Sequence, residues 1–195
     1  MTWSHSSAKQ FRQCQRQWYY KNCLANHKAR DMLRREAYLL SKLNSLSAWR
    51  GKLVDHVITA YVLPQIIRES SASLDGVLAK ARQLFDVQAE FARGNRMREP
   101  DMTQTKASEA YAAWQAIEYN EPITDSDIAT AWADVEQALK TFYSMEDIWS
   151  RIRAGTRFIA QRALQFTVLG LSVRAVPDLI VFCKDTAPLI IDWKV

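Results

Sequence analysis

Two apolar runs near the end of the chain constrain its fold more than any other feature. Residues 179–183 read Leu-Ile-Val-Phe-Cys, and residues 189–191 read Leu-Ile-Ile. Neither run alternates polar with apolar residues, which is typical of strands buried on both faces of a sheet. Asp178 precedes the first run, and Asp192 and Lys194 follow the second. Since isolated charges are costly to desolvate, these three side chains need partners.

A three-residue turn at 184–186 would join the two runs into a hairpin. Cys183 would then lie opposite Ala187, and the same register places Asp178 opposite Asp192. Directly opposed residues share one face, with their Cβ atoms about 5 Å apart. A cation would relieve the repulsion between two such carboxylates, and hard oxygen ligands suit a Mg²⁺ ion that keeps several waters. A solvated hairpin with an incidental ion pair is the alternative, and a different loop length would move Asp178 to the other face.

At these residues the chain resembles the PD-(D/E)XK nuclease superfamily and, within it, the RecB-like and CRISPR-associated RecB-like exonucleases. Val176-Pro177-Asp178 stands at the family's second motif, and Ile191-Asp192-Trp193-Lys194 stands at its third. Residues 49–56, Trp-Arg-Gly-Lys-Leu-Val-Asp-His, are similar to the helix that carries the family's metal-binding histidine. The family's N-terminal signature is similar to Ser4-His5-Ser6-Ser7 with Phe11, Cys14 and Trp18-Tyr19-Tyr20. Together the four motifs follow the family's order over nearly the whole chain.

The resemblance implies an α/β fold with a restriction-endonuclease-like core, in which helices flank a small mixed sheet. It also implies a metal-dependent DNA nuclease, with exonuclease action expected, in DNA repair, recombination or phage- and CRISPR-related processing. Asp178, Asp192 and Lys194 would be the catalytic residues, and Lys194 would orient the attacking water. The ligands of a Mg²⁺ or Mn²⁺ ion would be His56, Asp178, Asp192 and the backbone carbonyl of Trp193.

The chain departs from the family in two respects. The family's next elements, a QxxxY helix and a further strand, would follow Lys194, so the C-terminal part of the core is expected to be missing. Cys14 stands where some RecB-like nucleases place an iron–sulfur ligand, but Cys23 and Cys183 do not replace the other three, so no cluster is expected in this chain. A nuclease-like module that binds DNA or a partner protein without cutting is therefore the alternative function.

Positive charge is concentrated at the N-terminal end. The chain has a net charge of +5, and residues 1–52 alone hold eleven lysines and arginines against two acidic residues. Basic clusters attract polyanions through counterion release, and aromatic rings among them can stack on bases. A solvated helix face is the alternative. The predicted nucleic-acid-binding residues are Lys9, Arg12, Arg16, Trp18, Tyr19, Tyr20 and Lys21. DNA is the expected partner, with a helicase or recombination protein as a possible second one.

Composition places the chain among single-domain proteins. A chain of 195 residues that is 48% hydrophobic can bury one core, so we expect one domain over 1–195 with a helical lobe inserted at about 70–150. No segment reads as a signal peptide or a membrane span, and three widely spaced cysteines suit a reducing compartment, so we expect a cytoplasmic protein. Gly-rich phosphate loops, CxxC pairs, HExxH and GxSxG elements are absent from the sequence, which excludes the commonest nucleotide, zinc and serine-hydrolase sites.

Helical periodicity predicts five helices. One begins near residue 8 behind serine caps, with Phe11, Cys14 and Trp18 on its apolar face. The next, 47–67, has Trp49, Leu53, His56 and Ala60 on an inward stripe, where His56 would be a metal ligand or a hydrogen-bonded core residue. The other three span 73–93, 108–119 and 124–143. Strands are expected within 158–168, followed by a hairpin of 172–183 with 187–195.

Overall fold

The computed structural model describes residues 4–68, 73–184 and 186–193. Contacts divide the chain into two compact units. The first unit comprises residues 1–43 and 161–177, and the second comprises residues 44–160 and 178–195. The expectation of one domain over the whole chain stays a prediction. Over the described residues, each helix is too short or too polar to cross a membrane.

Short helices begin the first unit, namely α1 (His5–Gln13), α2 (Gln15–Tyr19), the π-helix η1 (Tyr20–Leu24) and α3 (Met32–Leu40). A serine caps α1 as expected, since the hydroxyl of Ser4 accepts a hydrogen bond from the main-chain N–H of Ser7, but the helix begins at His5 and not near residue 8. The single helix expected through Cys14 is wrong. Cys14 is extended, with φ of −157°, so it ends α1 and caps α2 with its sulfur.

A hairpin of β2 (Leu164–Val168) and β3 (Leu171–Ala175) completes the first unit. Its turn contains Leu169 and Gly170 at φ of 49° and 77°, a left-handed conformation that glycine adopts without strain. The strand predicted from 172 to 183 is therefore wrong, since β3 pairs with β2 and ends before Pro177. Proline has no N–H to donate to a ladder, which favours a break at this point.

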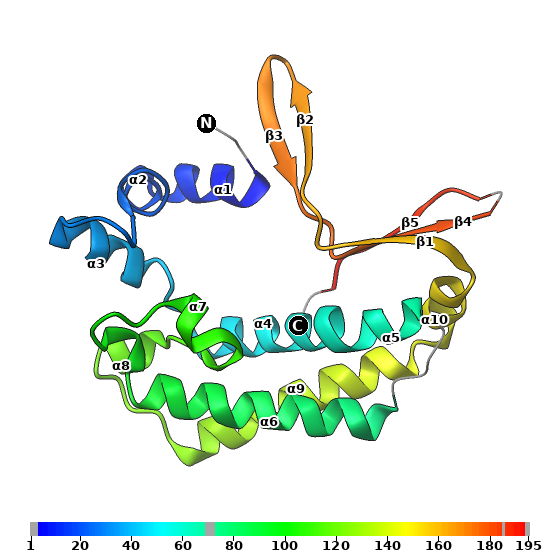
Figure 1. Ribbon diagram of the computed structural model, residues 1–195, viewed down its shortest axis with the longest axis horizontal. Helices are drawn as coiled ribbons and strands as arrows, with labels where there is room; N and C mark the ends of the chain where they lie inside the picture. Colours follow the sequence, from blue (N-terminus) through cyan, green and yellow to red (C-terminus); the bar gives the residue numbers. More distant parts are fainter. Residues whose placement is uncertain (1–3, 69–72, 185, 194–195) are drawn as a thin grey trace. The chain divides into compact units, whose positions relative to one another are not determined.

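Helices form most of the second unit (Figure 1). The long ones are α4 (Leu46–Val57), continued by the π-helix η2 (Ile58–Val62) and α5 (Leu63–Ile67), then α6 (Leu74–Arg93) and α9 (Asp125–Ser144). The short ones are η3 (Arg96–Arg98), α7 (Gln104–Ala107), η4 (Ser108–Ala110), α8 (Gln115–Glu118) and α10 (Glu146–Arg153). Ser73 caps α6, and Thr124 forms a capping box with Asp127 on α9, as the predicted starts require. The helix predicted at 108–119 is instead the separate turns η4 and α8.

Aromatic side chains hold α4, α6 and α9 together. The ring of Trp49 on α4 lies 4.8 Å from the ring centroids of both Phe85 and Trp114. Its indole N–H donates to Gln88 at 2.7 Å, which satisfies this polar group inside the core. Trp114 and Phe142 are buried packing residues. Phe85 of α6 in turn packs edge-on to Trp132 of α9, with ring centroids 5.4 Å apart, so the three helices share one core.

The sheet of the second unit has the order β1-β4-β5, with β1 (Gly155–Ala160), β4 (Leu179–Cys183) and β5 (Leu189–Ile191). All of its described pairings are antiparallel, whereas a mixed sheet was expected. Leu179 pairs with Ile191, which is the register predicted for the hairpin. The first apolar run is buried as predicted, since Leu179 and Val181 are inaccessible to solvent. The prediction that the second run, Leu189–Ile191, is buried on both faces is wrong. Among the described strands β5 pairs only with β4, and Ile190 is 66% exposed.

Candidate active site

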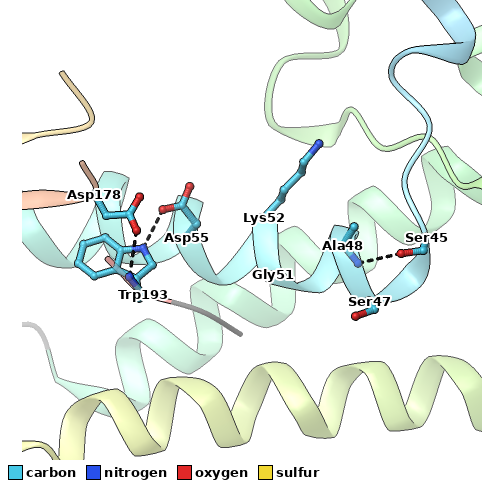
Figure 2. Close-up of a pocket in the computed structure, with 8 residues that line it drawn as sticks. All are labelled: Ser45, Ser47, Ala48, Gly51, Lys52, Asp55, Asp178 and Trp193. Carbon is cyan, nitrogen blue, oxygen red and sulfur yellow. Dashed lines mark hydrogen bonds between the residues drawn. The ribbon is translucent and has the colours of Figure 1, made fainter. Parts of the chain in front are cut away.

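A pocket of about 440 Å³ lies in the second unit, where α4 faces the ends of β4 and β5 (Figure 2). Gly51, Lys52 and Asp55 line it from one side of α4, because residues three and four apart share a helix face. Asp178 lines it from the start of β4, and Trp193 lines it from just beyond β5. The remaining lining residues are Ser45, Ser47 and Ala48. An acidic end with Asp55 and Asp178 thus adjoins a polar stretch of α4.

Asp178 of this acidic end contacts Asp192, which is not among the residues that line the pocket. They flank the pair of Leu179 with Ile191, so the ladder brings them to one side of the sheet as side-chain hydrogen-bonding partners. Burial raises the pKa of Asp178 above the ordinary value, and the contact with Asp192 and the charges of Asp55 and Asp192 raise it further. A main-chain N–H of Trp193 opposes this rise. Three carboxylates from two strand ends and one helix therefore act on one another here.

Trp193 contacts two of these carboxylates. Its main-chain N–H donates to Oδ2 of Asp178 at 3.0 Å, and its indole N–H donates to Oδ1 of Asp55 at 2.8 Å (Figure 2). The ring is half-buried, with its centroid 6.1 Å from that of Phe142. The sequence predicted only a role for the carbonyl of Trp193, and that role stays a prediction.

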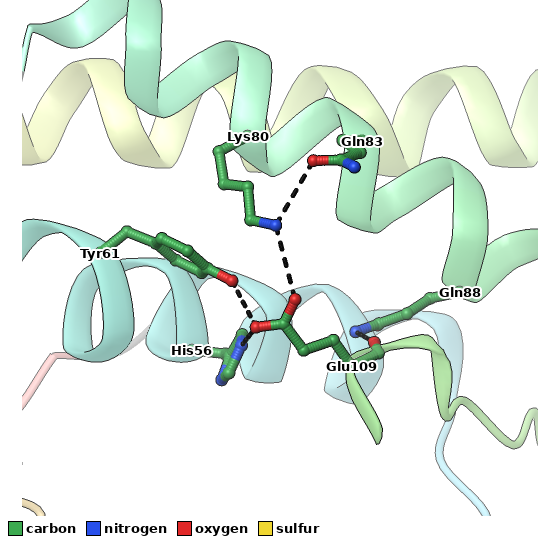
Figure 3. A network of polar contacts seen from close by, with 6 residues as sticks. All are labelled: His56, Tyr61, Lys80, Gln83, Gln88 and Glu109. Atoms are coloured by element: carbon green, nitrogen blue, oxygen red, sulfur yellow. Dashed lines mark hydrogen bonds and ion pairs between the residues drawn. The ribbon is translucent and has the colours of Figure 1, made fainter. Parts of the chain in front are cut away.

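His56 lies outside this pocket. Its Nε2 is 3.4 Å from Oε1 of Glu109, its ring packs edge-on to Tyr61, and its side chain is 41% exposed (Figure 3). The predicted inward stripe through His56 and Ala60 is wrong, because Ala60 is exposed and the buried residues of α4 are Trp49, Leu53, Val54 and Val57. The metal-ligand role of His56 stays a prediction. Asp55, which sequence reasoning missed, is the neighbour that reaches the pocket.

The donors present suit a hydrated divalent ion. Within residues 4–68, 73–184 and 186–193, no three His, Cys, Asp or Glu side chains converge as a ready metal cage. Mg²⁺, however, is often bound by one or two carboxylates together with substrate phosphates and waters. Asp178 and Asp192 supply such a pair, with the charge of Asp55 close by. Lys194, the third predicted catalytic residue, lies outside the described residues.

The predicted nucleic-acid-binding residues belong to the first unit. Lys9, Arg12, Arg16 and Lys21 are exposed there, and the guanidinium of Arg16 lies 5.8 Å from the ring centroid of Tyr20. Tyr19 is also exposed. Trp18, by contrast, is only 6% exposed, packs edge-on to Phe11 and donates its indole N–H to Ser7 at 2.7 Å. In this structure Trp18 is a packing residue, while binding by the segment stays a prediction.

Comparison with known proteins gives one family. Searches of the curated proteins and of the solved structures found no match. A family model of the PD-(D/E)XK nuclease superfamily matches residues 2–195, which is nearly the entire chain. The matched region includes both paired aspartates, the helix with Asp55 and the sheet that positions them. The chain therefore belongs to the PD-(D/E)XK nuclease superfamily.

Proposed function

We propose that this protein is a metal-dependent deoxyribonuclease that hydrolyses phosphodiester bonds in DNA. The observation that carries the proposal is the contact between Asp178 and Asp192 at the ends of paired strands, with Asp55 beside Asp178 at the acidic end of the pocket. Membership of a nuclease superfamily supports it. Exonuclease action in DNA repair, recombination or phage- and CRISPR-related processing is the finer form of the proposal.

In this proposal Asp178 and Asp192 hold a Mg²⁺ or Mn²⁺ ion through their carboxylate oxygens. We assign Asp55 as the third acidic group in preference to His56, because Asp55 lines the pocket with Asp178 whereas His56 contacts Glu109. When bound, the ion would activate a water nucleophile and offset the charge that develops on the phosphate. The proposed ligand role of the Trp193 carbonyl completes the set.

Two cationic side chains, Lys52 and Lys194, are proposed to act on the substrate. Lys52 lines the pocket from α4, where its ammonium group could contact a phosphate of the bound strand, and its Nζ now donates to Asn44 at 2.6 Å. Lys194 is proposed to orient the attacking water, by the resemblance to the family's third motif. Asp178 and Asp192 repel each other when both are ionised, so their pairing favours a cation between them.

The test is cleavage of single- and double-stranded DNA in Mg²⁺ or Mn²⁺. We expect Asp178→Asn, Asp192→Ala and Lys194→Ala each to lower the rate by roughly 100-fold or more, because each removes a group with a proposed role toward the metal or the attacking water. Asp147→Asn is the matched control, since Asp147 is an exposed carboxylate on α10 outside the pocket. Equal cleavage by the wild type and the three site variants would assign the activity to a contaminant or another site.

A module that binds DNA without cutting is the second candidate. Its support is that the described residues hold no ready group of three metal ligands. Such a module should bind DNA in the absence of divalent metal and take up no Mn²⁺ in a calorimetric titration. Uptake of one Mn²⁺ by the wild type and its loss in Asp178→Asn would favour the enzyme.

A further inference from the structure

The indole of Trp193 joins two elements that are far apart in the sequence. Asp55 belongs to α4, whereas Trp193 follows β5, and the indole N–H donates to Oδ1 of Asp55 at 2.8 Å. The main chain of the same residue donates to Oδ2 of Asp178 at 3.0 Å. One residue thus determines where an oxygen of each carboxylate lies at the acidic end of the pocket (Figure 2).

An N–H group suits this task for a chemical reason. The indole N–H donates a hydrogen bond and has no lone pair that could bind a cation. Trp193 can therefore hold Asp55 without its indole competing with that carboxylate for the cation. Hydrogen bonds to ionised acceptors are among the stronger ones in proteins. Each bond made by Trp193 uses one oxygen of a carboxylate and thereby fixes the direction of the other oxygen.

The indole is itself held in place. Its ring packs against Phe142 of α9, a buried residue, with a centroid distance of 6.1 Å and an interplanar angle of 68°. On the opposite side of the bond, α4 is fixed by its buried residues Leu53 and Val54. Donor and acceptor are therefore anchored to one helical core, which limits the rotation of the Asp55 carboxylate.

We infer that the Trp193 indole is a positioning residue that orients the Asp55 carboxylate toward a divalent cation held with Asp178. The inference rests on the proposed metal-dependent function. Residues that orient metal ligands commonly change metal affinity by about 10- to 100-fold when they are replaced. The role belongs to the side chain alone, because a substitution that keeps the main-chain N–H, such as phenylalanine, leaves the bond to Asp178 possible.

A second tryptophan provides a matched comparison. Trp149 packs on the same Phe142 ring at 5.0 Å, and its indole N–H donates to the main-chain carbonyl of Phe142 at 2.7 Å rather than to a carboxylate. Replacing either tryptophan by phenylalanine removes one indole N–H and keeps an aromatic ring. A structural role predicts the same outcome for both variants, whereas positioning predicts a difference.

The experiment is a calorimetric titration of the whole chain with MnCl₂, beside thermal unfolding of each variant. We expect Trp193→Phe to raise the dissociation constant of Mn²⁺ about 10-fold. Trp149→Phe should leave it within about twofold, even where its melting temperature falls. Unchanged affinity in Trp193→Phe, or an equal loss in Trp149→Phe, would overturn the inference.

A double-mutant cycle identifies the route of the effect. In an Asp55→Ala background the indole has no carboxylate to orient, so adding Trp193→Phe should change the affinity by less than about twofold. A further 10-fold loss in that background would show that Trp193 acts by another route and would overturn the inference. A wild-type protein that takes up no Mn²⁺ would overturn the proposed metal site itself, and the positioning role with it.

Discussion

Asp178 carries a carboxyl group whose ionisation depends on its neighbours. Burial is the largest cause that raises its pKa above the ordinary 3.8, and the hydrogen bond with Asp192 follows. Asp192→Ala removes this bond and one negative charge, so we expect the pKa of Asp178 to fall but to remain above 3.8 because burial persists. Titration of the ¹³C carboxyl signal in metal-free buffer measures the change.

Asp55→Ala is the comparison, since Asp55 raises the pKa of Asp178 by its charge alone and should cause a smaller fall. A pKa of Asp178 that is unchanged or higher in Asp192→Ala would contradict the geometry.

The raised pKa of Asp178 also makes the stability of the fold depend on pH. Because the folded-state pKa is raised, the stabilising contribution of Asp178 is present at low pH and is lost as the pH rises through that pKa.

Single residues show what the sequence could and could not predict about the site. The alignment of Asp178 with Asp192 was predictable, because a turn length and a two-residue strand period fix which residues face each other. The choice between Asp55 and His56 was not. Adjacent helical residues point about 100° apart, and the packing of Trp49 and Leu53 into the core decides which neighbour faces the pocket.

Among the elements, Glu109 of η4 links three helical segments (Figure 3). Its carboxylate accepts a hydrogen bond from Tyr61 of η2, lies 3.4 Å from His56 of α4 and lies 3.4 Å from Lys80 of α6. The bond from Tyr61, followed by those from His56 and Lys80, lowers the pKa of Glu109 below the ordinary 4.5. Ionised Glu109 therefore favours the folded state.

This cluster predicts a pH-dependent stability. A depressed folded-state pKa contributes stability above the unfolded value of 4.5 that is lost as the pH falls through the folded value. We expect the melting temperature of the wild type to fall more steeply than that of Glu109→Gln between about pH 5 and pH 3. Scanning calorimetry at pH steps of about 0.5 would measure the two melting curves. Parallel curves would show that the contacts of Glu109 contribute nothing to folding.

Gly155 is an element-scale test of the junction between α10 and β1. A Cβ added at this position would overlap the Val181 side chain of β4 and would lie 3.0 Å from the carbonyl oxygen of Ile152. Overpacking of a close contact costs about 1 to 3 kcal/mol, so Gly155→Ala should lower the free energy of unfolding by about that amount and shift the denaturation midpoint downward. Gly94→Ala, which would meet the flexible side chain of Arg96, should change it little. Equal midpoints for both variants would contradict the tight junction.

Elements with strong local signals were predictable. Capping residues and apolar periodicity fixed α6 and α9 nearly to the residue. The short helices between Arg96 and Glu118 were not predictable, because their chain is held by tertiary contacts such as the bond from Gln88 to the main chain of Glu109. The break near Pro177, where β3 pairs with β2 and β4 pairs with β5, was missed for a similar reason. Which strands pair depends on contacts between segments that are separate in the sequence.

At the scale of the whole molecule, the proposed binding residues and the proposed reacting groups belong to different units. The exposed cations Arg12, Arg16 and Lys21 lie in the first unit, and Asp178 lies in the second. Each phosphate contact that is lost reduces the slope of log affinity against log salt by about 0.7 to 0.9. Replacing all three cations by alanine should therefore reduce the slope by about 2 to 3, as measured by fluorescence anisotropy of a labelled DNA.

A triple replacement of exposed cations in the second unit is the charge-matched control for that slope. The control replaces Lys106, Lys140 and Arg151 by alanine. This change should leave the slope nearly unchanged, because these residues belong to neither the pocket nor the predicted binding segment.

Asp178→Asn then separates binding from cutting. In an enzyme it abolishes cleavage while the salt slope stays at the wild-type value, because the affinity comes from phosphate contacts elsewhere. A slope that is unchanged by the first triple but reduced by the second would assign DNA binding to the helical unit and refute the predicted role of the N-terminal segment.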